Sequence, residues 1–156
     1  MYVSKWFYIN SFFIILVIIS ILQGPMYDAK WIGFIAFLFF MFNWMRHAMF
    51  ATLRSKMARK KKIKLAKLSK KAMPWHRWTG TAAALFAVIH GLMMIHTFGF
   101  QTNNFKMMFG LMALVIIVLT VLTGWWRLMR TTVRKRLIHL TLAFTLFYLL
   151  VFHILL

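Results

Sequence analysis

Residues 75–98 read WHRWTGTAAALFAVIHGLMMIHTF, and from Trp78 onward they include no acidic side chain, no lysine and no arginine. A helix needs about 20 predominantly apolar residues to cross the hydrocarbon core of a bilayer, so this stretch predicts a transmembrane span. Two of its histidines, His76 and His90, are 14 positions apart. The same spacing returns near the end of the chain, between His139 and His153.

Four other apolar stretches are long enough to cross a membrane. With the first, the predicted spans are residues 6–22, 31–50, 78–98, 105–126 and 137–156. Hydrophobic residues make up 63% of the 156 positions and charged residues only 13%, against about 25% charged in an average chain. We therefore expect an all-α, polytopic transmembrane helical bundle that forms one domain over residues 1–156.

The composition excludes several kinds of chemistry. The chain has one acidic residue, Asp28, and no cysteine. One carboxylate cannot form a general acid–base pair, a magnesium site or a calcium cage. Without cysteine there is no disulfide, iron–sulfur cluster, thiolate zinc site or covalently attached haem. We therefore expect no catalytic residue in this chain.

The basic residues predict the topology. Of the 20 lysines and arginines, one precedes the first span and five lie between spans four and five. Twelve more run from Arg46, near the end of span two, to Arg77, just before span three. Only Lys30 and Lys106 lie at span ends on the opposite side of the membrane. Because cytoplasmic loops collect positive charge, we expect the N-terminus inside and the C-terminus outside, and no nucleic-acid partner. Spans three and five then run in the same direction.

The connection 51–77 holds most of these charges. Its leucines and isoleucine are scattered among lysines, which is typical of a segment that lies on anionic headgroups, so anionic lipid is an expected partner. Pro74 predicts that the third helix begins beside it, with His76 in the first turn.

The histidine spacing predicts two layers. Fourteen residues turn a helix through about 1400°, close to four turns, and advance it by about 21 Å. Both histidines of a span therefore lie on one face. Because the two spans are parallel, His76 meets His139 in an inner layer and His90 meets His153 in an outer layer.

Two facing imidazoles without further ligands favour haem. A zinc site takes three or four protein ligands, whereas a haem iron needs only two axial ones. We therefore expect two haem b groups, and an iron with both axial positions filled suits electron transfer. The alternative is that these histidines serve packing or proton relay within the membrane.

Small and basic neighbours complete the predicted site. Gly80, Ala83 and Gly91 would let a flat macrocycle approach the third span, although small residues also mediate helix packing. Arg77 is the main candidate to pair with haem propionates. The other candidates are Lys70, Lys71 and Arg136 for the inner layer and Gln101, Asn103, Asn104 and Lys106 for the outer layer. His47 and His96 are expected to be interfacial rather than ligands.

The segments WHRWTG (75–80), VIHG (88–91) and 137–153, which begins LIH and ends VFH, resemble the ferric reductase-like transmembrane domain. That superfamily includes NADPH oxidases, ferric reductases and the haem subunit of the bacterial methionine sulfoxide reductase system. The resemblance covers spans three to five. It implies two b haems in tandem, with His76 and His139 as inner ligands and His90 and His153 as outer ligands. Members often have six spans, and those that act alone carry a flavin- and nicotinamide-binding domain.

The sequence thus predicts a di-haem b-type cytochrome in the plasma membrane of a bacterium. A separate cytoplasmic reductase or a quinol is the expected donor, and the acceptor is extracytoplasmic. A resemblance to the cytochrome b of quinol-oxidising complexes leaves a quinone-linked subunit open. The remaining alternative is a non-haem structural or lipid-binding membrane subunit.

Overall fold

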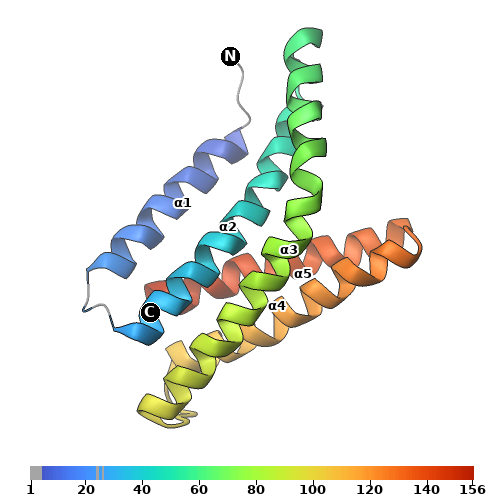
Figure 1. Ribbon diagram of the computed structural model, residues 1–156. Coiled ribbons are helices and arrows are strands. Elements are labelled where there is room, and N and C mark those ends of the chain that lie inside the picture. The colour runs from blue at the N-terminus through green and yellow to red at the C-terminus, as the bar shows by residue number, and fades with distance from the viewer. Residues whose placement is uncertain (1–4, 24, 26) are drawn as a thin grey trace.

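The computed structural model describes residues 5–23, 25 and 27–156, and this part of the chain is helical and has no strand. Five helices follow one another: α1 (Lys5–Leu22), α2 (Asp28–Arg54), α3 (Arg59–Phe98), α4 (Phe105–Met129) and α5 (Val133–Leu155) (Figure 1). All five are long and apolar enough to cross a membrane. The predicted all-helical class is confirmed, with five helices that are long and apolar enough to span a membrane.

The helix bounds lie within four residues of the predicted spans, except that α3 begins far ahead of its span. Helix α2 continues to Arg54, and α3 begins at Arg59, so most of the predicted connection 51–77 is helical. The lysines, leucines and alanines of this stretch are good helix formers. Pro74 lies inside α3, and the prediction that His76 occupies a first helical turn is therefore wrong. A proline removes one backbone hydrogen bond and kinks a helix, and Figure 1 shows α3 bending along its length.

The helices form two antiparallel hairpins. Helix α2 packs along α3, α4 packs along α5, and α3 meets α4 where the two hairpins join. Helix α1 lies against α2 and α5. In Figure 1 the end of α1, the start of α2, the α3–α4 connection and the C-terminus lie toward one end of the molecule, away from the α2–α3 connection. Helices α3 and α5 therefore run in the same general direction, while the side of the membrane that each end faces stays a prediction from the charges.

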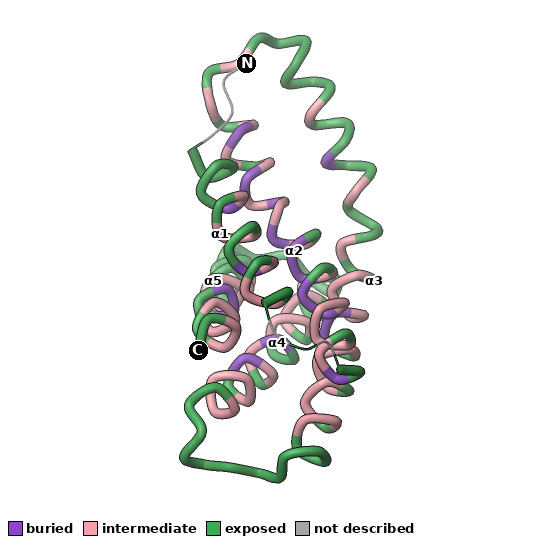
Figure 2. Tube along the Cα trace, turned by 90° about the vertical axis from the view of Figure 1, so that its left-hand side faces the viewer, coloured by how far each residue is buried: buried purple, intermediate pink, exposed green. Residues whose placement is uncertain are grey.

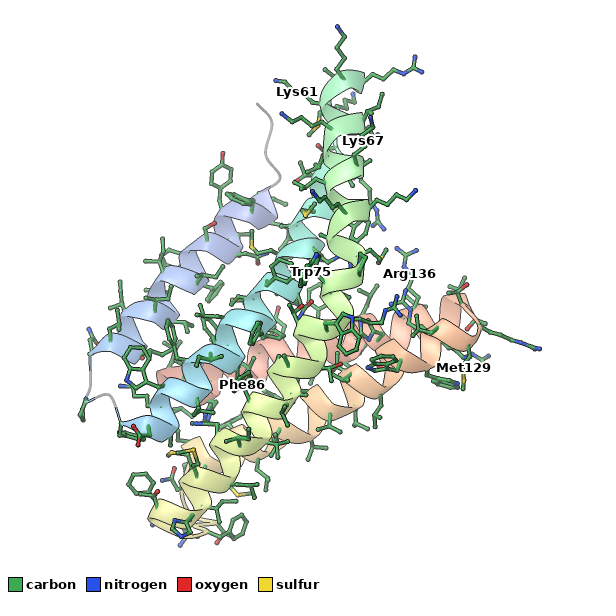
Figure 3. All side chains as sticks on the ribbon, viewed as in Figure 1. Lys61, Lys67, Trp75, Phe86, Met129 and Arg136 are labelled. Carbon is green, nitrogen blue, oxygen red and sulfur yellow. The ribbon has the colours of Figure 1, made fainter. Side chains whose placement is uncertain are left out.

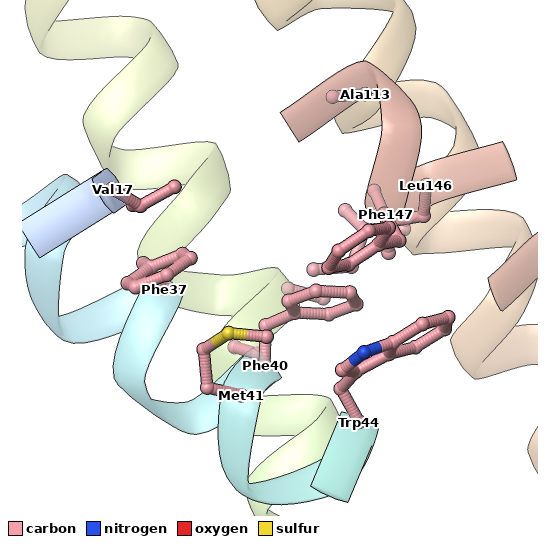
Figure 4. Packing of buried hydrophobic residues seen from close by; sticks show 11 residues of the cluster. Val17, Phe37, Phe40, Met41, Trp44, Ala113, Leu146 and Phe147 are labelled. Atoms are coloured by element: carbon pink, nitrogen blue, oxygen red, sulfur yellow. The ribbon is translucent and has the colours of Figure 1, made fainter. Parts of the chain in front are cut away.

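Buried residues concentrate on α2, which lies at the centre of the molecule (Figure 2). Its Phe40 and Trp44 pack toward Phe147 of α5, and the Trp44 and Phe147 rings stack 4.5 Å apart (Figure 4). Large apolar side chains such as Phe12, Leu92 and Leu122 are exposed on the other helices. An apolar exterior of this extent is stable where lipid covers it, as expected for a multi-pass membrane protein.

Candidate functional site

The structure brings the four spaced histidines together in two pairs. The ring centroids of His76 and His139 are 6.4 Å apart, with an angle of 82° between the ring planes. Those of His90 and His153 are 6.2 Å apart, at 73°. Each pair joins α3 to α5, and therefore joins one helical hairpin to the other. The partners within each pair are those that the parallel spans predict.

These separations suit two imidazoles on one metal. A metal–imidazole bond is about 2.0 Å long and the ring centre lies about 1.1 Å beyond the nitrogen, so two axial rings are about 6 Å apart. The described residues contain no group of three or more His, Cys, Asp or Glu side chains able to hold a metal ion. The pairs therefore lack the ligand number of a protein-only zinc site, and fit a metal that brings its other ligands with it.

The outer pair is oriented by backbone carbonyls. The Nδ1 atom of His90 lies 2.7 Å from the carbonyl oxygen of Ala29, and that of His153 lies 2.8 Å from the carbonyl oxygen of Lys106. A carbonyl only accepts hydrogen bonds, so each Nδ1 carries the proton and donates it. The other ring nitrogen, Nε2, then has no proton and carries a lone pair that is free to bind a metal. This arrangement is typical of histidines that bind a metal.

In the inner pair, hydrogen bonds orient only one of the two imidazoles. The Nδ1 atom of His139 lies 3.1 Å from the carbonyl oxygen of Thr120 and 3.2 Å from the Thr123 hydroxyl. The Nδ1 atom of His76 is buried and has no hydrogen-bond partner among the described residues. The inner layer therefore has one fixed imidazole, and the outer layer has two.

Glycines provide the space for three of the four rings. A Cβ atom added at Gly33 would lie 2.8 Å from the His90 ring, and one at Gly110 would lie 2.7 Å from the His153 ring. At Gly124 the added Cβ would be 3.4 Å from the His139 ring. Each glycine lies four residues after the carbonyl that accepts the Nδ1 proton, namely that of Ala29, Lys106 and Thr120 respectively. We call each such glycine and carbonyl a glycine–carbonyl bracket.

The register of α2 and α3 explains why His76 lacks a bracket. Gly33 faces His90, and ten residues along α2 the Asn43 side chain faces Gly80, ten residues back along α3. The same antiparallel register places His47 level with His76. A bracket here would need a glycine at position 47, where the chain has a histidine.

A cavity of about 540 Å³ adjoins the outer pair. His90, His153 and the glycines Gly33, Gly91 and Gly110 line it, and most of the rest of its wall is apolar. Its polar lining residues are Ser20, Tyr27, Lys30, Gln101, Asn104 and Lys106. An apolar cavity of this size with a few polar groups is typical of a cofactor site. Of the outer residues expected to meet propionates, Gln101, Asn104 and Lys106 line the cavity and Asn103 does not.

The other predicted residues occupy varied positions. Ala83 is buried in the core, and Gly80 packs against Asn43 of α2. Arg77 and His96 are exposed. His47 is half-buried among the rings of Trp6, Trp44 and Phe144, and its Nε2 atom has no partner among the described residues. His47 is thus enclosed by aromatic rings at the inner level.

The glycine–carbonyl brackets and the buried Arg46 were not predicted from the sequence. Gly110 and Gly124 are separated by the same 14 residues as each histidine pair, a signal that was available in the sequence. Arg46 of α2 is only 8% exposed and lies within electrostatic reach of His76 and His139. Arg46 lies inside the predicted span 31–50, unlike the basic residues that follow it, and this position was a signal available in the sequence.

No family model, curated protein or solved structure matches this chain. The ferric reductase-like resemblance therefore stays an expectation from the motifs around the histidines. The ring pairs, the brackets and the cavity carry the functional argument on their own.

Proposed function

We propose that this protein is a di-haem b-type membrane cytochrome that carries electrons across the bilayer. His76 and His139 would hold the inner haem, and His90 and His153 the outer haem. The observation that carries the proposal is the pairing of imidazoles about 6 Å apart, three of which donate from Nδ1 to a backbone carbonyl. A haem iron with two histidine ligands supplies one-electron transfer and leaves no position open for oxygen.

The chain's own residues prepare these positions for a metal. The hydrogen bonds from Nδ1 select the tautomer with a free Nε2 and fix the plane of each ring. Gly33 and Gly110 let the rings of His90 and His153 approach the neighbouring backbone. The apolar walls of the outer cavity, which include Phe37, exclude water and favour a macrocycle whose polar groups meet the lysines and amides of its lining.

The two layers are separated along the membrane normal. His76 and His90 are 14 residues apart on α3, a rise of about 21 Å out of the roughly 30 Å of hydrocarbon. The charge distribution assigns the inner layer to the cytoplasmic side, the N-terminus to the inside and the C-terminus to the outside. This topology supports transfer from a cytoplasmic donor to an extracytoplasmic acceptor in a bacterial plasma membrane.

The donor would dock on the first turns of α3, which we call the basic arm (residues 59–74). Its lysines are exposed, and Figure 3 shows Lys61 and Lys67 on the upper part of the helix. Arg59 precedes His76 by 17 residues, about 25 Å of helix and about three Debye lengths in physiological salt. The distal lysines therefore suit an acidic soluble reductase, and those nearest the bilayer, such as Lys70 and Lys71, suit anionic lipid. A quinol is the alternative donor.

Haem content tests the proposal directly. The purified chain should bind about two b haems in a pyridine haemochrome assay, with low-spin spectra typical of two axial histidines. His76→Ala and His139→Ala should each leave one haem, as should His90→Ala and His153→Ala, whereas His96→Ala on the exposed face of α3 should leave two. A wild-type protein without haem contradicts the proposal, and an unchanged haem content in the ligand variants contradicts the assignment.

A further inference from the structure

Arg46 is a buried cation without a matching anion. Its side chain is 8% exposed, and its Nε atom has no hydrogen-bond partner among the described residues. One terminal nitrogen, Nη2, lies 3.3 Å from the sulfur of Met73, and the guanidinium carbon lies 5.5 Å from the centre of the Phe50 ring. A thioether sulfur is a weak acceptor, and an unpaired buried charge costs several kcal/mol. The position therefore calls for an anionic acceptor.

The chain cannot supply that anion from a side chain. Its single acidic residue, Asp28, is 18 residues before Arg46 on the same helix, about 27 Å away. The charged neighbour of Arg46 is instead a second cation, Arg127 of α4. Both arginines act electrostatically on His76 and on His139. Two arginines from different hairpins thus lie within electrostatic reach of the inner histidine pair.

We propose that Arg46, together with Arg127, binds the propionates of the inner haem. This inference rests on the proposed function, because the carboxylates would arrive on the haem that His76 and His139 hold. An arginine presents several N–H groups in a fixed plane and binds a carboxylate through two of them, which is the chemistry that the unpartnered Nε offers. A phosphate or lipid headgroup offers similar oxygens, so the test separates these sources.

The assignment also explains the charges around the inner pair. Without an anion, Arg46 and Arg127 repel each other in a partly buried region, which is destabilising. The two propionate carboxylates would neutralise both cations. Arg77, which the sequence suggests for this role, is exposed.

The first experiment measures the inner haem in three variants. Arg46→Gln removes the charge, Arg46→Lys retains it, and Arg54→Gln removes an exposed charge two turns further along α2. In a potentiometric titration, Arg46→Gln should lower the reduced-to-oxidised ratio of one haem about tenfold at fixed potential, about 59 mV for a one-electron couple. Arg46→Lys should lie between this variant and the wild type, and Arg54→Gln should match the wild type.

The second experiment replaces haem by its dimethyl ester, which has no propionate charge. Haem release to a scavenging apoprotein is measured for both cofactors in the wild type and in Arg46→Gln. With haem, the substitution should speed release from the inner layer at least tenfold. With the ester, wild type and variant should release at similar rates, because the interaction that the substitution removes is already absent.

The outcomes are separable. A substitution effect as large with the ester as with haem overturns the propionate assignment and favours a phosphate or lipid anion. If the wild type binds two haems and Arg46→Gln behaves as Arg54→Gln does, the inference fails and the proposed function stands. If the wild type binds no haem, both fail. Should Arg46→Gln not fold, Arg46→Lys and the wild-type comparison of the two cofactors still decide the question.

Discussion

At the scale of single residues, the imidazoles are held by backbone rather than by side chains. The bracket on α2 consists of Gly33 and the Ala29 carbonyl, and that on α4 near the same level consists of Gly110 and the Lys106 carbonyl. In a helix this carbonyl already accepts the N–H of the glycine itself, so the histidine adds a second donor. The missing Cβ gives the ring access to the oxygen. With only one acid in the chain, backbone carbonyls supply the orienting acceptors that carboxylates supply elsewhere.

We predict that Gly33→Ala and Gly110→Ala each release the outer haem. The added methyl would lie 2.8 or 2.7 Å from an imidazole atom, so the ring must move and its hydrogen bond is lost. Overpacking and the lost bond together cost about 2–4 kcal/mol, enough to weaken retention at least tenfold. Haem content and release rate after purification measure this effect.

Gly80→Ala and Gly124→Ala provide the comparison. The new methyl at Gly80 would meet Asn43 at 3.6 Å, an ordinary contact, and haem content should not change. The methyl at Gly124 would lie 3.4 Å from the His139 ring and should weaken the inner haem only slightly. Equal losses in all four variants would mean that glycine serves general helix packing here and not ring placement.

At the scale of elements, α3 is one continuous helix that extends from the aqueous phase into the predicted bilayer. Its second half crosses the predicted bilayer with the histidines, and its first half is the basic arm. The sequence predicted the apolar half well, because hydropathy and the need to satisfy backbone groups in lipid define it. It did not predict the helical arm, because Pro74 is a strong signal for a helix start. The packing of α3 along α2 outweighs the single hydrogen bond that proline removes.

We predict that charge reversal on the arm uncouples the protein from a soluble donor without affecting the haems. Replacing Lys60, Lys61 and Lys64 by Glu should leave haem content and reduction by dithionite unchanged. It should slow reduction by a cytoplasmic fraction at low ionic strength at least tenfold, because electrostatic steering raises association rates by about 10 to 1,000 times.

Varying the ionic strength provides an internal control for donor docking on the basic arm. Wild-type reduction should slow as ionic strength rises, while reduction of the charge-reversed protein should change little. If the wild-type rate is independent of salt, or if a quinol reduces both proteins equally fast, the arm is not the donor's docking surface.

At the scale of the whole molecule, the sequence indicated the spans and the two layers but not what holds them. Span number, parallel direction and the 14-residue spacing follow from periodicity and charge, and the structure pairs the rings of His76 with His139 and of His90 with His153 accordingly. The brackets depend on the register between neighbouring helices, which no single-helix pattern contains. Likewise, the burial of Arg46 depends on how α2 and α3 pack, not on its local sequence.

We predict the orientation of the molecule from its charges, and the absence of cysteine makes the prediction simple to test. Ala58→Cys lies in the short α2–α3 connection and Thr102→Cys in the α3–α4 connection, and both positions are exposed. In intact cells a membrane-impermeant thiol reagent should label Thr102→Cys, and it should label Ala58→Cys only after permeabilisation. The reverse pattern would invert the assignment of inner and outer layers.

The division into two hairpins has a consequence for biosynthesis. The bracket for His90 lies on α2 and the brackets for His139 and His153 lie on α4, so each hairpin contains a ligand together with the backbone that orients it. The first hairpin is complete once α3 has left the ribosome, and the second once α5 has followed. Neither needs the cofactor in order to orient these ligands. Under the proposed function, haem would bind last, between two hairpins that have already formed. Cells short of haem would then accumulate a membrane-inserted apoprotein rather than an unfolded chain.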